Sequence, residues 1–183
     1  MKILRKILPL ISSVISTIMF FVTKDDYSGD YPQEFKSVYF TLILFSLFCV
    51  YIQMKEIKFP FENWKHTLTA SLCSFWLFIN QLHIWLCSNN WNTEYNIYSI
   101  FLIIAFGAFG LTYFQNIYCQ KTKFSFQAFI CITALILLGA GGVWAFILKY
   151  YDQAIVCICT FLLALTDFIS INSDKIIVES GGN

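Results

Sequence analysis

The sequence predicts an all-α integral membrane protein, a six-transmembrane-helix bundle with both termini in the cytoplasm. Three observations lead to this prediction. Of the 183 residues, 58% are hydrophobic and only 13% are charged, whereas a soluble domain has about 25% charged residues. The hydrophobic residues also gather in long runs. These runs lie near residues 3–22, 37–54, 66–88, 97–118, 126–148 and 154–171.

The length of the runs suits a helix that crosses a bilayer. A hydrocarbon core of about 30 Å needs roughly 20 helical residues, and unpaired backbone amides are not tolerated in lipid. We therefore expect residues 1–172 to form a single transmembrane domain, followed by a polar tail at residues 173–183. The first run follows "MKILRK" but ends in "FFVTKDD", which lacks the small residues of a cleavage site, so we interpret it as a signal anchor.

The connections before the other runs are short. The second run follows the acidic segment "TKDDYSGDYPQEFK", which contains turn signals at Gly29 and Pro32. The third and fifth follow "KFPF" and "KFSF", in which Lys can reach phosphate while Phe lies at the acyl boundary. These similar tetrapeptides indicate interfacial anchors, or else the trace of an ancestral hairpin repeat.

The basic residues set the expected orientation. With a cytoplasmic N-terminus, nine of the 12 basic residues lie on the inner side and three, Lys24, Lys36 and Lys149, lie outside. Cytoplasmic connections are enriched in Lys and Arg, so this count favours two cytoplasmic termini. The lack of an N-x-S/T sequon is compatible with a bacterial inner membrane, which we take as the location.

Polar residues in the third run predict a face that packs against protein. A spacing of three and four residues connects His66, Thr69, Cys73, Trp76, Asn80, His83 and Cys87. The opposite face is aliphatic and aromatic, which suits acyl chains. We therefore expect His83 to point at protein.

The same spacing predicts a small or polar face on each of the other helices. These faces hold Pro9, Ser13 and Ser16; Tyr39, Leu42, Ser46, Cys49 and Gln53; Tyr98, Phe101, Ala105, Ala108, Thr112, Gln115 and Cys119; Gln127, Cys131, Ala134, Leu138, Gly141 and Ala145; and Gln153, Cys157, Thr160, Ala164 and Asp167. Such faces let membrane helices approach closely. We expect interhelical packing at His66, Cys73, Trp76, Ala105, Ala108, Thr160 and Ala164.

Two ionisable residues, His83 and Asp167, are candidates for a ligand, ion or proton path, because charge inside a membrane is costly and often functional. The depths of the two residues exclude a direct pair. Expected partners are Asp152, Gln153 and Tyr39 for His83, and His66, Gln115 and Gln53 for Asp167. The tentative path comprises Asn80, His83, Asp167, Gly139, Gly141 and Gly142.

The segment "GAGG" at residues 139–142 has two interpretations. It predicts close helix packing, or alternatively a broken helix that presents backbone carbonyls to an ion or substrate. Seven scattered cysteines contain no C-x-x-C, and Cys157 and Cys159 lie about 200 degrees apart around a helix, so we expect small apolar residues rather than a metal or redox site.

Other chemistry is not indicated. No G-x-S-x-G, P-loop or H-E-x-x-H occurs, so we expect neither an enzyme, catalytic residues, a metal nor a cofactor. A net charge of +1 with scattered basic residues argues against nucleic acid as a partner.

Two functions remain open. The first is a membrane-embedded interaction, accessory or immunity-type subunit, which binds a membrane-protein partner or its own copies within the bilayer or through the acidic outer loop. The second is a small channel or transporter whose polar path involves His83 and Asp167. Short connections and missing catalytic motifs favour the first.

Overall fold

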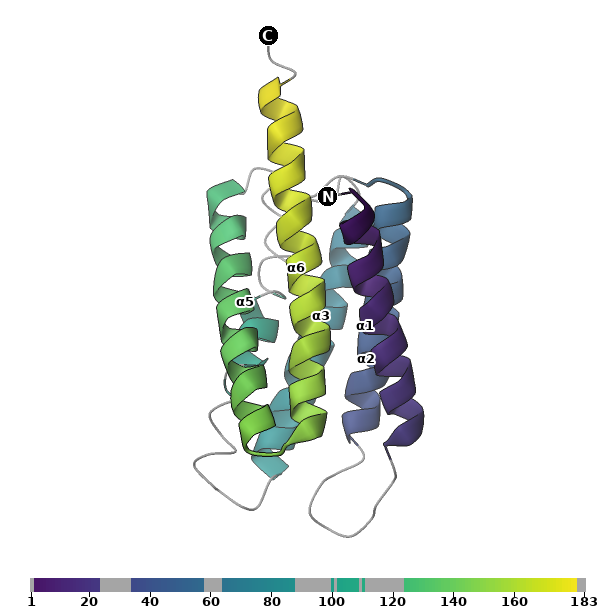
Figure 1. Cartoon of the computed structure of the whole chain (residues 1–183), viewed down its shortest axis with the longest axis vertical. Coiled ribbons are helices and arrows are strands. Elements are labelled where there is room, and N and C mark those ends of the chain that lie inside the picture. Colours follow the sequence, from purple (N-terminus) through teal and green to yellow (C-terminus); the bar gives the residue numbers. More distant parts are fainter. Residues whose placement is uncertain are drawn as a thin grey trace.

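The regular structure of the described residues is helical throughout. A computed structural model of the chain describes residues 2–23, 34–57, 64–87, 100, 102–108, 110 and 124–180. Residues 102–108 form a short helical stretch. The longer helices are α1 (Lys2–Val22), α2 (Glu34–Met54), α3 (Trp64–Cys87), α5 (Phe124–Ile147) and α6 (Tyr151–Ser180). They lie side by side in a bundle, with the start of α1 and the end of α6 at the same end (Figure 1).

Four of these helices are long and apolar enough to cross a membrane. They contain the segments Ile3–Val22, Lys36–Met54, Phe129–Ile147 and Tyr151–Ser170. Helix α3 has 24 residues but is not among these four, and it carries Asn80, Gln81 and His83 within its apolar sequence. Most of the predicted span 97–118 lies outside the described residues. The structure therefore supports a helical bundle of the membrane type, while the six crossings stay a prediction.

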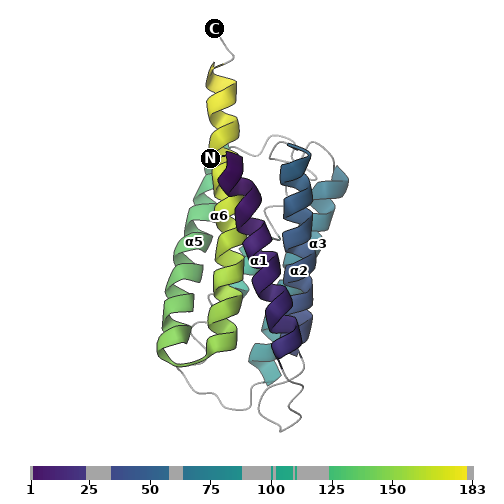
Figure 2. The ribbon, with the colours of Figure 1, turned by 45° about the vertical axis from the view of Figure 1, so that its right-hand side comes forward.

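Helix α6 lies at the centre of the described bundle. Of its apolar span, 67% of the residues are buried, compared with 28% to 44% in the spans of α1, α2 and α5. It packs against all three of these helices, and Figure 2 shows it between α5 and α1. Small side chains cover much of its buried surface: Ala154, Cys157, Cys159, Thr160, Ala164, Thr166 and Ser170. Such residues allow neighbouring backbones to come close.

A tight turn joins α5 to α6. The Lys149 amide donates to the carbonyl of Phe146 at 3.0 Å, and the Tyr150 amide donates to that of Ala145 at 2.9 Å. Together with a φ of 64° at Lys149, these bonds form a Schellman cap. The ring of Tyr150 then packs against Ala145 and Ala154. The turn therefore holds the two helices antiparallel at their junction.

Helix α6 is longer than expected. The hydropathy pattern predicted a helix over 154–171 and a polar tail from 173, but the helix runs from Tyr151 to Ser180. Its end extends beyond the ends of the other helices (Figure 1). The reason lies in the sequence, because no Pro or Gly interrupts the polar segment before Gly181. Hydropathy predicts which part of a helix can cross lipid, but it does not predict where the helix ends.

The glycine-rich segment belongs to a continuous helix. Helix α5 runs unbroken through residues 139–142, which contradicts the alternative of a broken helix with exposed carbonyls. Gly142 faces α6, since a Cβ built there would lie 3.1 Å from the Cβ of Cys157. At Gly139 the nearest atom would be the Cε2 of Phe161 at 3.8 Å, an ordinary contact. Gly142 is therefore the position where α5 and α6 approach closely.

These distances predict opposite effects for two similar substitutions. We expect Gly142→Ala to lower the free energy of unfolding by about 1–3 kcal/mol, because the Cβ of Cys157 is fixed to the α6 backbone and cannot move aside. We expect Gly139→Ala to raise it by about 0.5–1 kcal/mol, because alanine favours a helix and has room there. Reversible unfolding in detergent micelles measures both; equal effects from the two variants would contradict the close approach at Gly142.

Candidate functional site

Three polar side chains on α2 connect this helix to the rest of the bundle at three depths. Tyr39, Ser46 and Gln53 follow each other at intervals of seven residues, so they lie on one face of the helix. Tyr39 and Gln53 bond directly to α6, and Ser46 bonds to a serine of α1 that itself bonds α6. This face, including Leu42 and Cys49 between the polar residues, is the one that the spacing predicted.

The first layer joins the beginnings of α2 and α6, and we call it the outer layer because the predicted orientation places it on the outer side. The hydroxyl of the fully buried Tyr39 donates to the Oδ1 of Asp152 at 3.1 Å and lies 3.2 Å from the carbonyl oxygen of the same residue. Asp152 lies in the first turn of α6, where a carboxylate is favoured by the helix dipole. Both residues were expected partners of His83, but here they pair with each other.

The middle layer joins three helices through Ser12 of α1. Its hydroxyl lies 2.9 Å from the hydroxyl of Ser46 and 3.2 Å from the carbonyl oxygen of Cys159. A serine has one hydroxyl proton, so Ser12 donates to the Cys159 carbonyl and accepts from Ser46. The thiol of Cys159 in turn donates to the Ser12 carbonyl over a longer distance of 3.9 Å. Direct contacts thus fill the middle of the α1, α2 and α6 interface.

The third layer, which the predicted orientation places on the inner side, lies one helical turn from the acidic residue Asp167. We call Gln53, Thr166, Asp167 and Ser170 the inner polar cluster. The Gln53 amide donates to the Ser170 hydroxyl at 3.0 Å, which donates to the Thr166 carbonyl at 2.9 Å. Asp167 is only 7% exposed, and its carboxylate is within electrostatic range of the Cys49 and Cys131 thiols.

The predicted partners of Asp167 are placed differently from one another. Gln53 belongs to the inner polar cluster, because it bonds Ser170, which follows Asp167 by one helical turn. His66 is half-buried, and its ring lies against those of Phe48 and Tyr51, with centroids 6.2 and 6.0 Å apart. Gln115 lies outside the described residues. The inner cluster is therefore built by α2 and α6.

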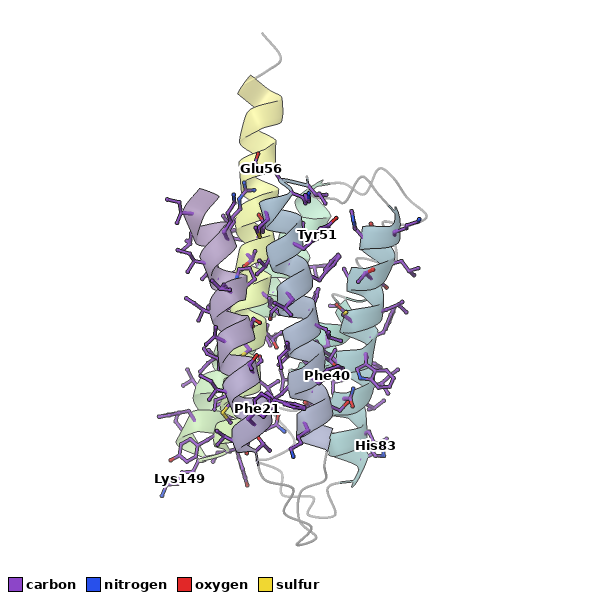
Figure 3. All side chains as sticks on the ribbon, turned by 90° about the vertical axis from the view of Figure 1, so that its right-hand side faces the viewer. Phe21, Phe40, Tyr51, Glu56, His83 and Lys149 are labelled. Atoms are coloured by element: carbon purple, nitrogen blue, oxygen red, sulfur yellow. The ribbon has the colours of Figure 1, made fainter. Side chains whose placement is uncertain are left out.

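Helix α3 is rotated relative to the prediction. The predicted protein-facing stripe included Trp76 and His83, but Trp76 is 53% exposed and His83 is exposed on the outer side of the helix (Figure 3). The buried residues are instead Thr67, Ala70, Ser71, Ser74, Leu77, Asn80 and Gln81. The prediction that Trp76 and His83 face the other helices of the bundle was wrong, because small residues next to the stripe allow closer packing than large aromatic ones.

The buried face of α3 packs against α2 and the helical segment around residue 106. The Ser71 hydroxyl donates to the Gly110 carbonyl at 3.2 Å. The Asn80 amide donates to the Trp76 carbonyl at 2.8 Å, and this hydrogen bond lies within helix α3. Gln81, fully buried, was not among the predicted site residues.

The other predicted site residues fall into two groups by exposure. Ala105, Gly141, Thr160 and Ala164 are buried, and His66, Cys73, Ala108, Gly139 and Gly142 are half-buried. His83 lies at the end of the bundle opposite Tyr51 and Glu56 (Figure 3), whereas the inner cluster involves Gln53 near that second end. The structure therefore does not bring His83 and Asp167 together.

The cysteines of the described part of the chain lie in helix interfaces. Five of them are free thiols, and no three His, Cys, Asp or Glu side chains within these described residues gather at a spacing that would hold a metal ion. Cys157 faces Gly142 on α5, and Cys159 faces Ser12 on α1. These two cysteines thus serve the packing of two different neighbours.

Comparison with known proteins finds no matching family model, no matching curated protein and no matching solved structure. The class of the protein consequently follows from the fold and its polar layers. It is a helical bundle of the membrane type, with four apolar helices of membrane-crossing length.

The middle layer predicts a measurable coupling between two serines. In a double-mutant cycle, Ser12→Ala and Ser46→Ala should show an interaction energy of about 0.6 kcal/mol, and no more than about 1.7 kcal/mol, because interhelical hydrogen bonds in membranes have this strength. Unfolding in detergent micelles measures the cycle. A parallel cycle of Ser13→Ala with Ser46→Ala should give no coupling, and equal coupling in both cycles would contradict this assignment.

Proposed function

We propose that the protein is a non-enzymatic binding subunit of the membrane, an accessory or immunity-type protein that recognises a protein partner within the bilayer. The proposal includes six crossings, cytoplasmic termini and a location in a bacterial inner membrane. The observation that supports the binding role is the exposure of Trp76 on α3.

Trp76 is unusual for a side chain in contact with lipid. It lies near the middle of α3 (Trp64–Cys87) and is 53% exposed. Lipid-facing Trp residues concentrate at the two membrane interfaces, where the indole N–H can reach water or head groups. At mid-span an exposed indole is better covered by protein, which offers both apolar contact and hydrogen-bond acceptors.

The other outward faces of the bundle differ from that of α3. Across its middle turns α1 exposes only aliphatic side chains among its large hydrophobic residues: Leu10, Ile11, Val14 and Ile18. The middle of α5 likewise exposes Ile132, Ile136 and Val143. These are surfaces that acyl chains cover well. The contrast within one molecule supports a protein-binding role for the outward face of α3.

The topology is supported by the positions of the helix ends. An even number of crossings returns the chain to the side on which it began, and α1 begins at the end of the bundle where α6 finishes (Figure 1). The basic residues favour the cytoplasm for that side. The acidic segment 24–33, which was proposed as another contact surface, lies outside the described residues.

Photo-crosslinking from single positions tests the binding role. A benzophenone amino acid replaces Ile79, which is 54% exposed on α3, or Ile132, which is 44% exposed on α5. In native membranes we expect a protein adduct from position 79 and lipid adducts alone from position 132. Protein adducts from neither position, or equal yields from both, would contradict the proposal.

A second function, a small channel or transporter, is favoured by one observation. The acidic residue Asp167 is only 7% exposed, lies near the end of the apolar span Tyr151–Ser170, and precedes by one helical turn Ser170, which bonds Gln53. Ionisable residues in such positions commonly line ion or proton paths. The direct contacts of the Ser12 layer oppose a continuous path along the α1, α2 and α6 interface.

Flux measurements separate this second function from the first. If the protein conducts, Asp167→Asn should lower ion or proton flux into proteoliposomes at least tenfold, because the substitution removes the charge while keeping the size. Ser170→Ala should have a smaller effect, since only one partner of Gln53 is lost. Flux equal to that of empty liposomes in the unaltered protein would exclude conduction.

A further inference from the structure

The turn between α5 and α6 lies between two helical segments that are long and apolar enough to cross a membrane. The apolar segment of α5 ends at Ile147, and that of α6 begins at Tyr151. Lys149 lies midway between these ends, and its exposed side chain points away from the bundle (Figure 3). Backbone groups that leave the helical pattern are not satisfied in hydrocarbon, so a turn between two crossing helices belongs at the membrane surface. In a bilayer, this places Lys149 at the depth of the lipid head groups.

Lys149 also occupies a position that glycine usually fills. Its φ of 64° lies in the left-handed region, which is unfavourable for a residue with a Cβ and costs glycine almost nothing. The Schellman cap of this turn needs only the backbone of residue 149, so glycine would support the same bonds. A strained residue at a position that suits glycine indicates a role for its side chain. Two roles are open, a contact with the negative end of the α5 dipole and a contact with a ligand outside the bundle.

Four exposed residues near Lys149 have the chemistry of the head-group region. We call Trp144, Phe146, Ile147, Lys149 and Tyr151 the turn surface. Trp and Tyr concentrate at membrane interfaces, where the ring meets acyl chains and the polar atom meets water or head groups. The Phe146 and Tyr151 rings lie edge to face, with their centroids 5.8 Å apart. The turn surface thus combines one cation and two hydrogen-bond donors with the apolar side chains of Phe146 and Ile147.

We propose that the turn surface binds an anionic phospholipid, whose phosphate contacts the Lys149 ammonium and whose acyl chains lie on Phe146 and Ile147. Charge complementarity supports this occupant. Within the described residues Lys149 is in no ion pair, and Asp152, the nearest acid in the sequence, accepts a hydrogen bond from the buried Tyr39 hydroxyl. The stem of a lysine can lie along apolar side chains while its ammonium reaches phosphate. This inference is independent of the proposed function, which concerns the outward face of α3.

Lipid binding by the full-length chain can be measured directly. The purified protein in detergent micelles is titrated with phosphatidylglycerol or with phosphatidylcholine, and native mass spectrometry gives the dissociation constant of each bound lipid. We expect the unaltered chain to bind phosphatidylglycerol about fivefold more tightly than phosphatidylcholine. Lys149→Gln removes the charge but keeps an L-residue at the strained position. It should weaken phosphatidylglycerol binding about fivefold, because one lysine near an anionic lipid surface contributes roughly that factor.

Two glycine variants separate the two roles of the Lys149 side chain. Lys149→Gly should weaken phosphatidylglycerol binding as much as Lys149→Gln does, but it should unfold at no lower temperature than the unaltered chain, because glycine relieves the strain. Glu56→Gly is the matched control. Glu56 has a φ of 53° in an equivalent cap at the end of α2, with bonds to the carbonyls of Gln53 and Ile52. This control should be relieved of strain in the same way without weaker lipid binding.

Three results would overturn the inference. Equal affinity of the unaltered chain for the two lipids, or unchanged phosphatidylglycerol affinity in both Lys149 variants, would exclude the turn surface as a lipid site. Lower thermal stability of Lys149→Gly with unchanged lipid affinity would assign the side chain to the α5 dipole instead. None of these results bears on the crosslink from position 79, so the binding function of α3 stands or fails separately.

Discussion

The arrangement of α1, α2 and α6 depends on hydrogen bonds that an apolar environment strongly favours. A hydroxyl or amide inside the bundle is stabilised by a partner on the protein, because lipid offers none. Not every buried group has one, since the Ser74 hydroxyl of α3 is buried without a hydrogen-bond partner. Ser12 is bonded to Ser46 of α2 and to the Cys159 carbonyl of α6. A rotation of any of the three helices would leave a buried hydroxyl without its partner. The polar residues therefore determine how these helices are turned, while the apolar residues determine that they lie in a membrane.

Helix α5 is held against α6 by a capped turn and by close packing. A tight turn capped at Lys149 sets its direction, and Gly142 lets its backbone approach α6 near Cys157. Van der Waals contact then continues along the buried face through Cys131, Ala134, Leu138 and Ala145. The two sides of α6 thus use different physical means. Hydrogen bonds fix rotation on the α1 and α2 side, and close approach fixes distance on the α5 side.

The sequence predicts some of these faces and misses others for a physical reason. On α2 the polar residues Tyr39, Ser46 and Gln53 coincide with the small or buried positions, so one pattern marks one face. On α3 two patterns compete. One contains Trp76 and His83, the more polar and distinctive residues, and the other contains Ser71, Ser74 and Gln81. Burial in the bundle follows the second, because small side chains permit contact between backbones. Periodicity shows both stripes but does not decide which neighbour each one meets.

The position of α2 between the two candidate surfaces constrains how they can influence each other. Its Cys49 and Gln53 face Asp167 and Ser170 of α6, whereas Phe48 and Tyr51 lie against His66 of α3. Within the described helices, α2 therefore lies between the inner cluster of α6 and helix α3. Hydrogen bonds hold α2 to α6 near both of its ends and to Ser12 of α1 between them. A change at the exposed face of α3 around Trp76 can reach the inner cluster along α2 only through a helix that is bonded along its length.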